Sequence, residues 1–186
     1  MRADAKANHD AIIRAAHAQL AAHGADVPLS AVAEAAGVGI ATLYRNFPTR
    51  DALIRAVLGD MSEVLRGIVA RALAALDRDP QTGWRDFVHA VARLRPGALT
   101  SVFAAQFVRD DHIPASIEAQ RSHSMEAVQG VLDRAREAGL VAPDLTAAKF
   151  QMGIASITRP LPDVAAPAIA EHQAWLVDVF LKGLRP

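Results

Sequence analysis

The sequence contains no cysteine, and this absence removes whole classes of chemistry from consideration. Without thiols, the 186-residue chain forms neither disulfides nor thiolate metal sites, and a reducing cytosol suits it. No uninterrupted apolar run reaches the roughly 18 residues that a membrane span needs. The polar opening Met1–Asp10 shows no signal-peptide pattern. We therefore expect a soluble, cytoplasmic protein with no membrane partner.

The chain also has no excess of positive or negative charge, because it contains 20 Lys and Arg residues and 20 Asp and Glu residues. This balance excludes a uniformly basic protein, so any contact with nucleic acid must depend on local charge. Alternating β-branched runs typical of strands are absent. Alanine is frequent and hydrophobic residues make up 52% of the chain. Because alanine favours helices, an all-α fold with a sizeable core is expected.

Signals of catalysis are also lacking. The sequence shows no glycine-rich loop for phosphates and no nucleophile elbow, and its histidines are scattered. Asp110, Asp111 and His112 are adjacent, but they fall in an expected loop and are interpreted as solvated rather than metal-binding. We therefore expect no catalytic residues, no metal site and no cofactor, and an enzyme is the least favoured function.

The clearest motif lies between Ser30 and Ile54, in the segment SAVAEAAGVGIATLYRNFPTRDALI. Pro28 favours an extended approach, after which Ser30 is expected to cap a short helix over about 31–36. Gly37 then ends this helix. A second short helix is expected over 40–46, and Thr49 is expected to cap a long helix over about 50–76. This order predicts a helix, a tight turn, a second helix and a long connecting helix.

The second short helix has an unusual outer face. Leu43 and Phe47 are spaced i, i+4, so both are expected to point inward. The side chains left outside are Ala41, Thr42, Tyr44 and Arg45. Together they offer a small residue, a hydroxyl, a phenol and a guanidinium, a set that suits the major groove of DNA.

The segment AEAAGVGIATLYRNFPTRDALI resembles the helix-turn-helix of the tetracycline-repressor-like (TetR) transcriptional regulators, with similarity from about Ile12 to Leu58. The resemblance implies a three-helix DNA-binding domain at 1–49 and a helical ligand-binding and dimerisation domain at 50–186. It implies DNA-binding residues Ser30, Gly39, Ile40, Ala41, Thr42, Tyr44, Arg45, Thr49 and Arg50. Gly39, Ile40 and Asn46 depart from the commoner residues and reduce the number of polar donors. Base readout is therefore expected to depend more on contact with thymine methyl groups.

Further helices are expected over about 84–95, 99–107, 117–138, 147–158 and 168–182, with Pro96–Gly97 as a break and Pro160, Pro162 and Pro167 in the last link. Aromatic and methionine side chains in this part are interpreted first as ordinary core. The resemblance also implies a ligand cavity among these helices, for which the candidates are Trp84, Phe87, Phe103, Gln106, Phe107, Arg121, Met125 and Met152.

The last two expected helices carry more apolar residues than their length requires. They are again interpreted either as core or, through the resemblance, as a two-fold four-helix dimer interface. The interface candidates are Phe150, Ile154, Ile157, Trp175, Leu176, Val179 and Phe180.

The favoured hypothesis is a homodimeric, ligand-responsive repressor that binds a palindromic double-stranded DNA operator and responds to an unknown small-molecule effector. The alternative is a helical small-molecule-binding or adaptor protein whose DNA-reading unit is vestigial. The N-terminal region lends the alternative weight, because its charged side chains to Arg55 nearly cancel. The surface from Thr42 to Arg50 is the feature that decides between the two hypotheses, because only the first hypothesis requires it to contact DNA.

Overall fold

The computed structural model describes residues 2–108, 113–159 and 169–186, which form α-helices and no strand. The predicted all-α fold is confirmed. The N-terminal part contains α1 (Arg2–His23), α2 (Leu29–Ala35) and α3 (Ile40–Asn46), and the long α4 (Arg50–Leu76) follows. The C-terminal part contains α5 (Pro80–Arg93), α6 (Pro96–Phe107), α7 (Ala115–Glu137), α8 (Ala147–Ile157) and α9 (Ile169–Gly183).

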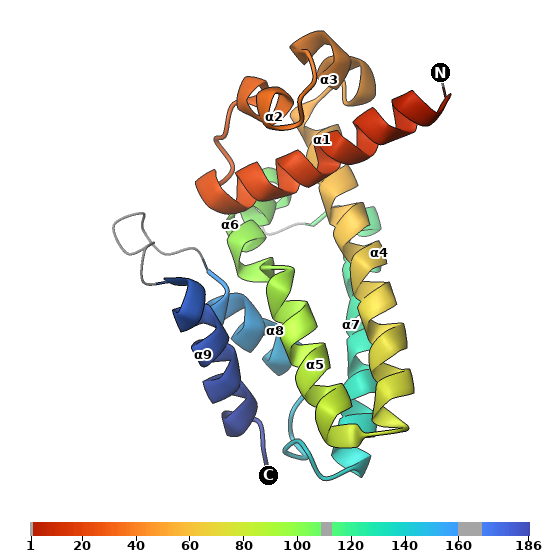
Figure 1. Ribbon diagram of the computed structural model, residues 1–186, viewed down its shortest axis with the longest axis vertical. Helices are drawn as coiled ribbons and strands as arrows, with labels where there is room; N and C mark the ends of the chain where they lie inside the picture. Colours follow the sequence, from red (N-terminus) through yellow and green to blue (C-terminus); the bar gives the residue numbers. More distant parts are fainter. Residues whose placement is uncertain (1, 109–112, 160–168) are drawn as a thin grey trace.

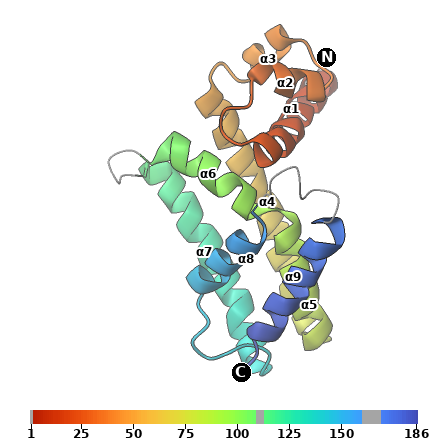
Figure 2. The same cartoon turned by 90° about the vertical axis from the view of Figure 1, so that its left-hand side faces the viewer.

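The helices form a small N-terminal unit and a larger helical body that share α4 (Figure 1). α1, α2 and α3 gather at one end of the molecule. From there α4 runs into the body, where it packs against α5 and α7. α6 contacts both α1 and α8 and so lies between the unit and the body (Figure 2). Two helices, α4 and α6, therefore connect the N-terminal unit to the rest of the chain.

Local signals set several helix ends where the sequence predicted them. Gly24 and Gly37 adopt left-handed backbone, with φ of 79° and 68°, just after α1 and the last turn of α2. The Thr49 hydroxyl accepts a hydrogen bond from the backbone N–H of Ala52 at 3.1 Å and caps α4. The predicted bounds of α3 and α4 are confirmed.

Three other helices start earlier than predicted, each at or directly after a proline. α2 begins at Leu29 after the extended Pro28, so Ser30 lies inside the helix and does not cap it. α5 and α6 begin at Pro80 and Pro96, earlier than expected. Proline suits the first helical position because that residue needs no N–H donor. The preceding helix α5 ends at Arg93, as the predicted break at Pro96–Gly97 requires, and Pro96 also begins the next helix.

The segments 110–112 and 160–168, where an acidic loop and a proline-rich link were expected, lie outside the described residues.

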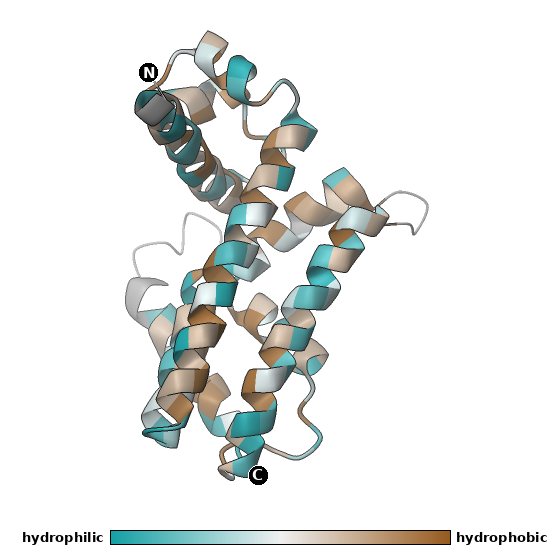
Figure 3. Cartoon of the chain, turned by 90° about the vertical axis from the view of Figure 1, so that its right-hand side faces the viewer, coloured by the Kyte–Doolittle hydropathy of each residue, from teal (hydrophilic) through white to brown (hydrophobic). Residues whose placement is uncertain are grey.

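Two groups of buried side chains form the interior. The N-terminal core joins α1–α3 to the start of α4 and one face of α6, through Ile12, Leu20, Val32, Leu43, Phe47, Leu53, Val57, Leu99, Val102 and Phe107. The C-terminal core joins the rest of α4 to α5 and α7–α9, through Ile68, Leu76, Trp84, Phe87, Val131, Leu132, Phe150, Ile154 and Val177. Hydrophobic and hydrophilic residues alternate along α4 (Figure 3). The N-terminal core continues past residue 49 into the first turns of α4. The domain boundary expected after residue 49 stays a prediction.

Candidate DNA-binding face and ligand cavity

The short helix α3 has a buried face and an open face. Leu43 is fully buried and Phe47 is 4% exposed, and both pack in the N-terminal core. On the other side Ile40 and Tyr44 are 43% and 49% exposed, and Ala41 and Arg45 are exposed as well. Two large side chains left open on a seven-residue helix form a surface suited to contact with another molecule.

Two polar side chains of α3 donate hydrogen bonds within the helix. Arg45 Nη2 donates to Thr42 Oγ1 at 2.8 Å, and Asn46 Nδ2 donates to the Thr42 carbonyl at 2.8 Å. Arginine carries five N–H donors, so Arg45 keeps donors for another acceptor. Its guanidinium is thus held close to the Thr42 hydroxyl on the open side of the helix.

Residues flanking α3 continue the open face. Ser30, Gly39 and Thr49 are exposed. The Thr49 oxygen accepts the N–H of Ala52, which leaves its own O–H proton able to donate to a phosphate. No atom lies within 4 Å of the position a Gly39 Cβ would take, so neither sterics nor its φ of −68° requires glycine there.

Arg50 is half-buried and makes intramolecular hydrogen bonds at the start of α4. Its Nη1 donates to the Ala25 carbonyl at 2.6 Å and its Nη2 donates to the Val27 carbonyl, so the guanidinium lies against the loop between α1 and α2. These carbonyls belong to no helix and need donors. The side chain therefore ties the start of α4 to this loop, and a direct phosphate contact from Arg50 stays a prediction.

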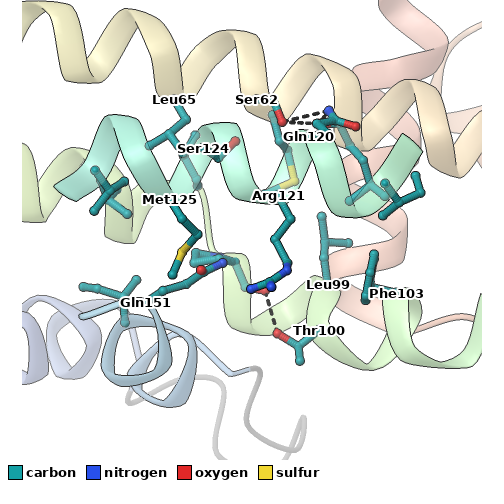
Figure 4. A pocket seen from close by; sticks show the side chains of 18 of the residues that line it. Ser62, Leu65, Leu99, Thr100, Phe103, Gln120, Arg121, Ser124, Met125 and Gln151 are labelled. Atoms are coloured by element: carbon teal, nitrogen blue, oxygen red, sulfur yellow. Dashed lines mark hydrogen bonds between the residues drawn. The ribbon is translucent and has the colours of Figure 1, made fainter. Parts of the chain in front are cut away.

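A cavity of about 280 Å³ lies among α4, α5, α6, α7 and α8 (Figure 4). Its apolar lining is Leu58, Met61, Leu65, Val91, Leu94, Pro96, Leu99, Phe103, Ile117, Met125, Val128, Phe150 and Ile154. Leu58, Met61 and Phe103 also pack on the N-terminal core, whereas Leu65, Leu94 and Met125 pack on the C-terminal core. The cavity is therefore located where the two cores meet.

A few polar groups also border the cavity, namely Ser62, Thr100, Gln120, Arg121, Ser124 and Gln151. Gln120 Nε2 donates to Ser62 Oγ at 2.8 Å and to the Leu58 carbonyl at 3.1 Å, which links α7 to α4 (Figure 4). An apolar lining with few polar groups is typical of small-molecule sites.

Arg121 is the charged side chain of this lining. Glu118 accepts hydrogen bonds from Arg121 Nε at 2.9 Å and Nη2 at 2.6 Å. These bonds lower the pKa of Glu118 and raise the pKa of Arg121. Both groups consequently keep their charges near neutral pH. In Figure 4 the Arg121 side chain extends from α7 toward Thr100 on α6.

Three of the residues expected to line a cavity do so here, namely Phe103, Arg121 and Met125. Trp84 and Phe87 do not, because their rings pack against Phe150 at centroid distances of 5.8 Å and 5.7 Å and fill the C-terminal core.

Phe107 is also outside the cavity lining, since it is buried in the N-terminal core under the guanidinium of Arg55. Gln106 is half-buried at the end of α6 without bordering the cavity, and Met152 is 68% exposed. The expectation for these five residues is corrected. The interior polar pair Ser62 and Gln120, which sequence reasoning missed, gives a usable signal because polar residues interrupt the apolar stripes of α4 and α7.

The expected dimer-interface residues divide into two groups. Phe150 and Ile154 are 1% and 0% exposed within one chain and line its cavity, so the expectation that they form an interface is corrected. The others lie nearer the surface. Trp175 and Val179 are 56% and 44% exposed, and Ile157, Leu176 and Phe180 are half-buried.

Two further features of the described residues bear on other functions. Within 2–108, 113–159 and 169–186, no group of three metal-binding side chains comes together. No helix in those ranges has the length and apolar character that a membrane span requires.

The geometry defines a class of protein, an all-helical DNA-binding regulator with a helix-turn-helix unit and a helical body that contains a cavity. Residues 12–57 match the family described as "Bacterial regulatory proteins, tetR family". Residues 79–186 match "Transcriptional regulator SbtR-like, C-terminal domain". The chain therefore belongs to the TetR family of transcriptional regulators, which confirms the resemblance found in the sequence. No curated protein matches it significantly.

Solved structures agree over nearly the whole length. The TetR regulator SCO0520 from Streptomyces coelicolor is 29% identical with a TM-score of 0.66, over 96% of this chain and 98% of that one. A TetR regulatory protein from Mycobacterium vanbaalenii is 26% identical with a TM-score of 0.60, over 100% and 99%. LfrR from Mycobacterium smegmatis, solved in complex with proflavine, is 25% identical with a TM-score of 0.64, over 93% and 92%.

Proposed function

We propose that this protein is a cytoplasmic, homodimeric repressor that a small molecule releases from a palindromic DNA operator. The observation that carries the proposal is the position of the cavity at the junction of the two cores. α4 begins beside the helix-turn-helix and continues along the cavity. A ligand that fills the cavity better in one arrangement of α4 than in another shifts the population toward that arrangement. The proposed function consists of DNA binding and ligand binding, without catalysis.

In the proposed complex α3 lies in the major groove. Thr42, Tyr44, Thr49 and Ser30 contact phosphates, and Arg45 contacts a phosphate or a guanine edge. Gly39, Ile40 and Ala41 lie nearest the bases, where their apolar atoms contact thymine methyl groups. Arg50 supports this face from behind by holding the loop after α1.

Dimerisation is proposed through α8 and α9. Met152, Trp175 and Val179 leave apolar surface exposed on these two helices. An isologous interface pairs such a patch with its copy, which places two recognition helices on one side of the DNA. A two-fold dimer requires an operator with matching two-fold symmetry, and this is why a palindrome is proposed.

The test is a gel shift with DNA from upstream of the protein's own gene. We expect a sequence-preferring complex whose affinity falls as salt rises, because Arg and Lys contacts release counterions from the phosphates. The double substitution Tyr44→Ala with Arg45→Ala should abolish the complex. Retention of a native-like regulatory response by that variant would favour the adaptor alternative, in which the DNA-reading unit is vestigial.

A further inference from the structure

We propose that the ligand is a small amphipathic carboxylic acid, with its apolar body in the cavity and its carboxylate on Arg121. This inference rests on the proposed ligand-binding role of the cavity and adds the chemical class. It draws on the charge of the lining, the orientation of one guanidinium and the size of the space.

The lining disfavours a cationic ligand. Among the described residues that border the cavity none is Asp or Glu, and Arg121 is the one charged side chain. A buried ammonium group without an anionic partner is strongly destabilised by loss of hydration. An organic cation would therefore find no anionic side chain in the lining, because Glu118 lies outside it and is already paired with Arg121.

The orientation of Arg121 favours a carboxylate. Glu118 uses one edge of the guanidinium, formed by Nε and Nη2. Within the described residues Nη1 makes no hydrogen bond, so the end of the fork formed by Nη1 and Nη2 keeps donors for a second acceptor. A planar carboxylate matches that end in a bidentate arrangement. Glu118 thereby acts as a positioning residue that holds the fork in place.

Among the other polar groups of the lining, the Gln151 side-chain amide supplies N–H donors suited to a carboxylate head group. Thr100 and Gln151 border the cavity from α6 and α8, and the Arg121 side chain points toward Thr100 (Figure 4). Thr100 Oγ1 donates its own proton to the Pro96 carbonyl at 3.1 Å. Arg121 is half-exposed, so the charged end of the ligand stays near water while its body is buried.

The size of the cavity limits the apolar body. A water molecule takes about 30 Å³ of liquid volume, and a methylene group is of similar size. A cavity of about 280 Å³ therefore has room for an apolar chain of several such groups. A saturated acid with a chain of about eight carbons matches a cavity of this size.

The experiment measures binding of octanoate, octanol and octylammonium to the purified full-length protein by isothermal titration calorimetry at neutral pH. The three probes share one chain and differ in the head group. We expect octanoate to bind about tenfold more tightly than octanol, because hydrogen bonds to charged groups are the stronger kind. Octylammonium should bind more weakly than octanol. In Arg121→Gln the advantage of octanoate over octanol should disappear.

The matched control is Arg66→Gln, since Arg66 also pairs with a glutamate three residues away, Glu63, but lies outside this cavity. Arg66→Gln should keep the preference for octanoate. Three results would overturn the inference: octylammonium binding as well as octanoate, an Arg121→Gln variant that keeps the preference, or no binding of any probe by the folded protein. A gel shift on the same preparation reports DNA binding separately, so the ligand class can fail while the proposed regulator stands.

Discussion

Arg45 and Arg50 show that two arginines five positions apart take different roles from their surroundings. Arg45 is exposed on α3 and, within the part of the chain that the structure describes, its guanidinium bonds to the neighbouring Thr42 hydroxyl. Arg50 is half-buried and donates to two carbonyls of the loop after α1. The sequence presents both as positive charges beside a recognition helix. The packing of residues about 25 positions earlier separates a surface contact from a structural one.

Single alanine substitutions test this separation. Arg50→Ala should lower the free energy of unfolding by about 1–3 kcal/mol, because two carbonyls lose a charged donor. It should also weaken DNA binding through the displaced loop. Arg45→Ala should weaken DNA binding about tenfold while stability changes by less than about 0.5 kcal/mol. Urea denaturation and gel shifts measure both quantities. Equal stability of the two variants would contradict the assigned roles.

Gly97 is the second residue of α6 and marks the closest approach of two helices. A Cβ built on Gly97 would lie 1.9 Å from the Ala155 carbonyl oxygen on α8. The Gly97 N–H donates to Thr158 Oγ1 at 3.0 Å, and Thr158 is fully buried. The backbones of α6 and α8 therefore touch without a side chain between them, which positions one wall of the cavity.

Gly97→Ala is accordingly expected to destabilise the protein by about 1–3 kcal/mol through overpacking. The matched control is Gly130→Ala in α7, where no atom lies within 4 Å of the built Cβ. That change should stabilise the protein by roughly 0.5–1 kcal/mol, because alanine favours the helix interior. Thermal denaturation followed by circular dichroism compares the two variants. A Gly97→Ala protein as stable as the parent would mean that α6 and α8 separate easily.

At the scale of the helix, neighbouring residues determine the bounds of some helices, whereas the bounds of others depend on distant packing. α4 starts where expected because Thr49 caps it through its immediate neighbours, and α3 also has the expected bounds. The starts of α5 and α6 differ because proline either ends or begins a helix, and distant packing decides between these outcomes. Cavity residues were harder to predict. Trp84 and Phe103 look alike in sequence, yet one fills the C-terminal core and the other borders the cavity.

The face formed by α8 and α9 carries the test of the proposed dimer. Trp175→Glu should produce monomers, because a symmetric interface would bury the new charge twice without a partner. Since Trp175 is 56% exposed in the single chain, the helical content should stay unchanged. The control is Val64→Glu, which places the same charge at a 42% exposed apolar position on α4. Light scattering at micromolar concentration gives the mass. A Trp175→Glu protein that remains dimeric would place the interface elsewhere.

Across the whole molecule, α4 is the element that belongs to both cores. Its first turns supply Leu53, Ile54 and Val57 to the N-terminal core, and its second half supplies Ile68 and Leu76 to the C-terminal core. The cavity borders its middle. Interiors are close-packed, so a ligand that moves the middle of α4 must shift side chains at both ends. The fold thus offers a physical connection between cavity and DNA-binding face.

If this connection operates, coupling must be reciprocal. If octanoate lowers the affinity for the operator by a given factor, bound operator must lower the affinity for octanoate by the same factor. Both changes follow from one coupling free energy. Typical couplings of about 5–150-fold lie within calorimetric range. Calorimetric titration of octanoate into free and operator-saturated protein measures one side, and gel shifts measure the other. The variant with Tyr44→Ala and Arg45→Ala should bind octanoate equally with or without DNA. If the change in operator affinity and the change in octanoate affinity were unequal, two-state coupling through α4 would be contradicted. Octanoate would then act outside this equilibrium.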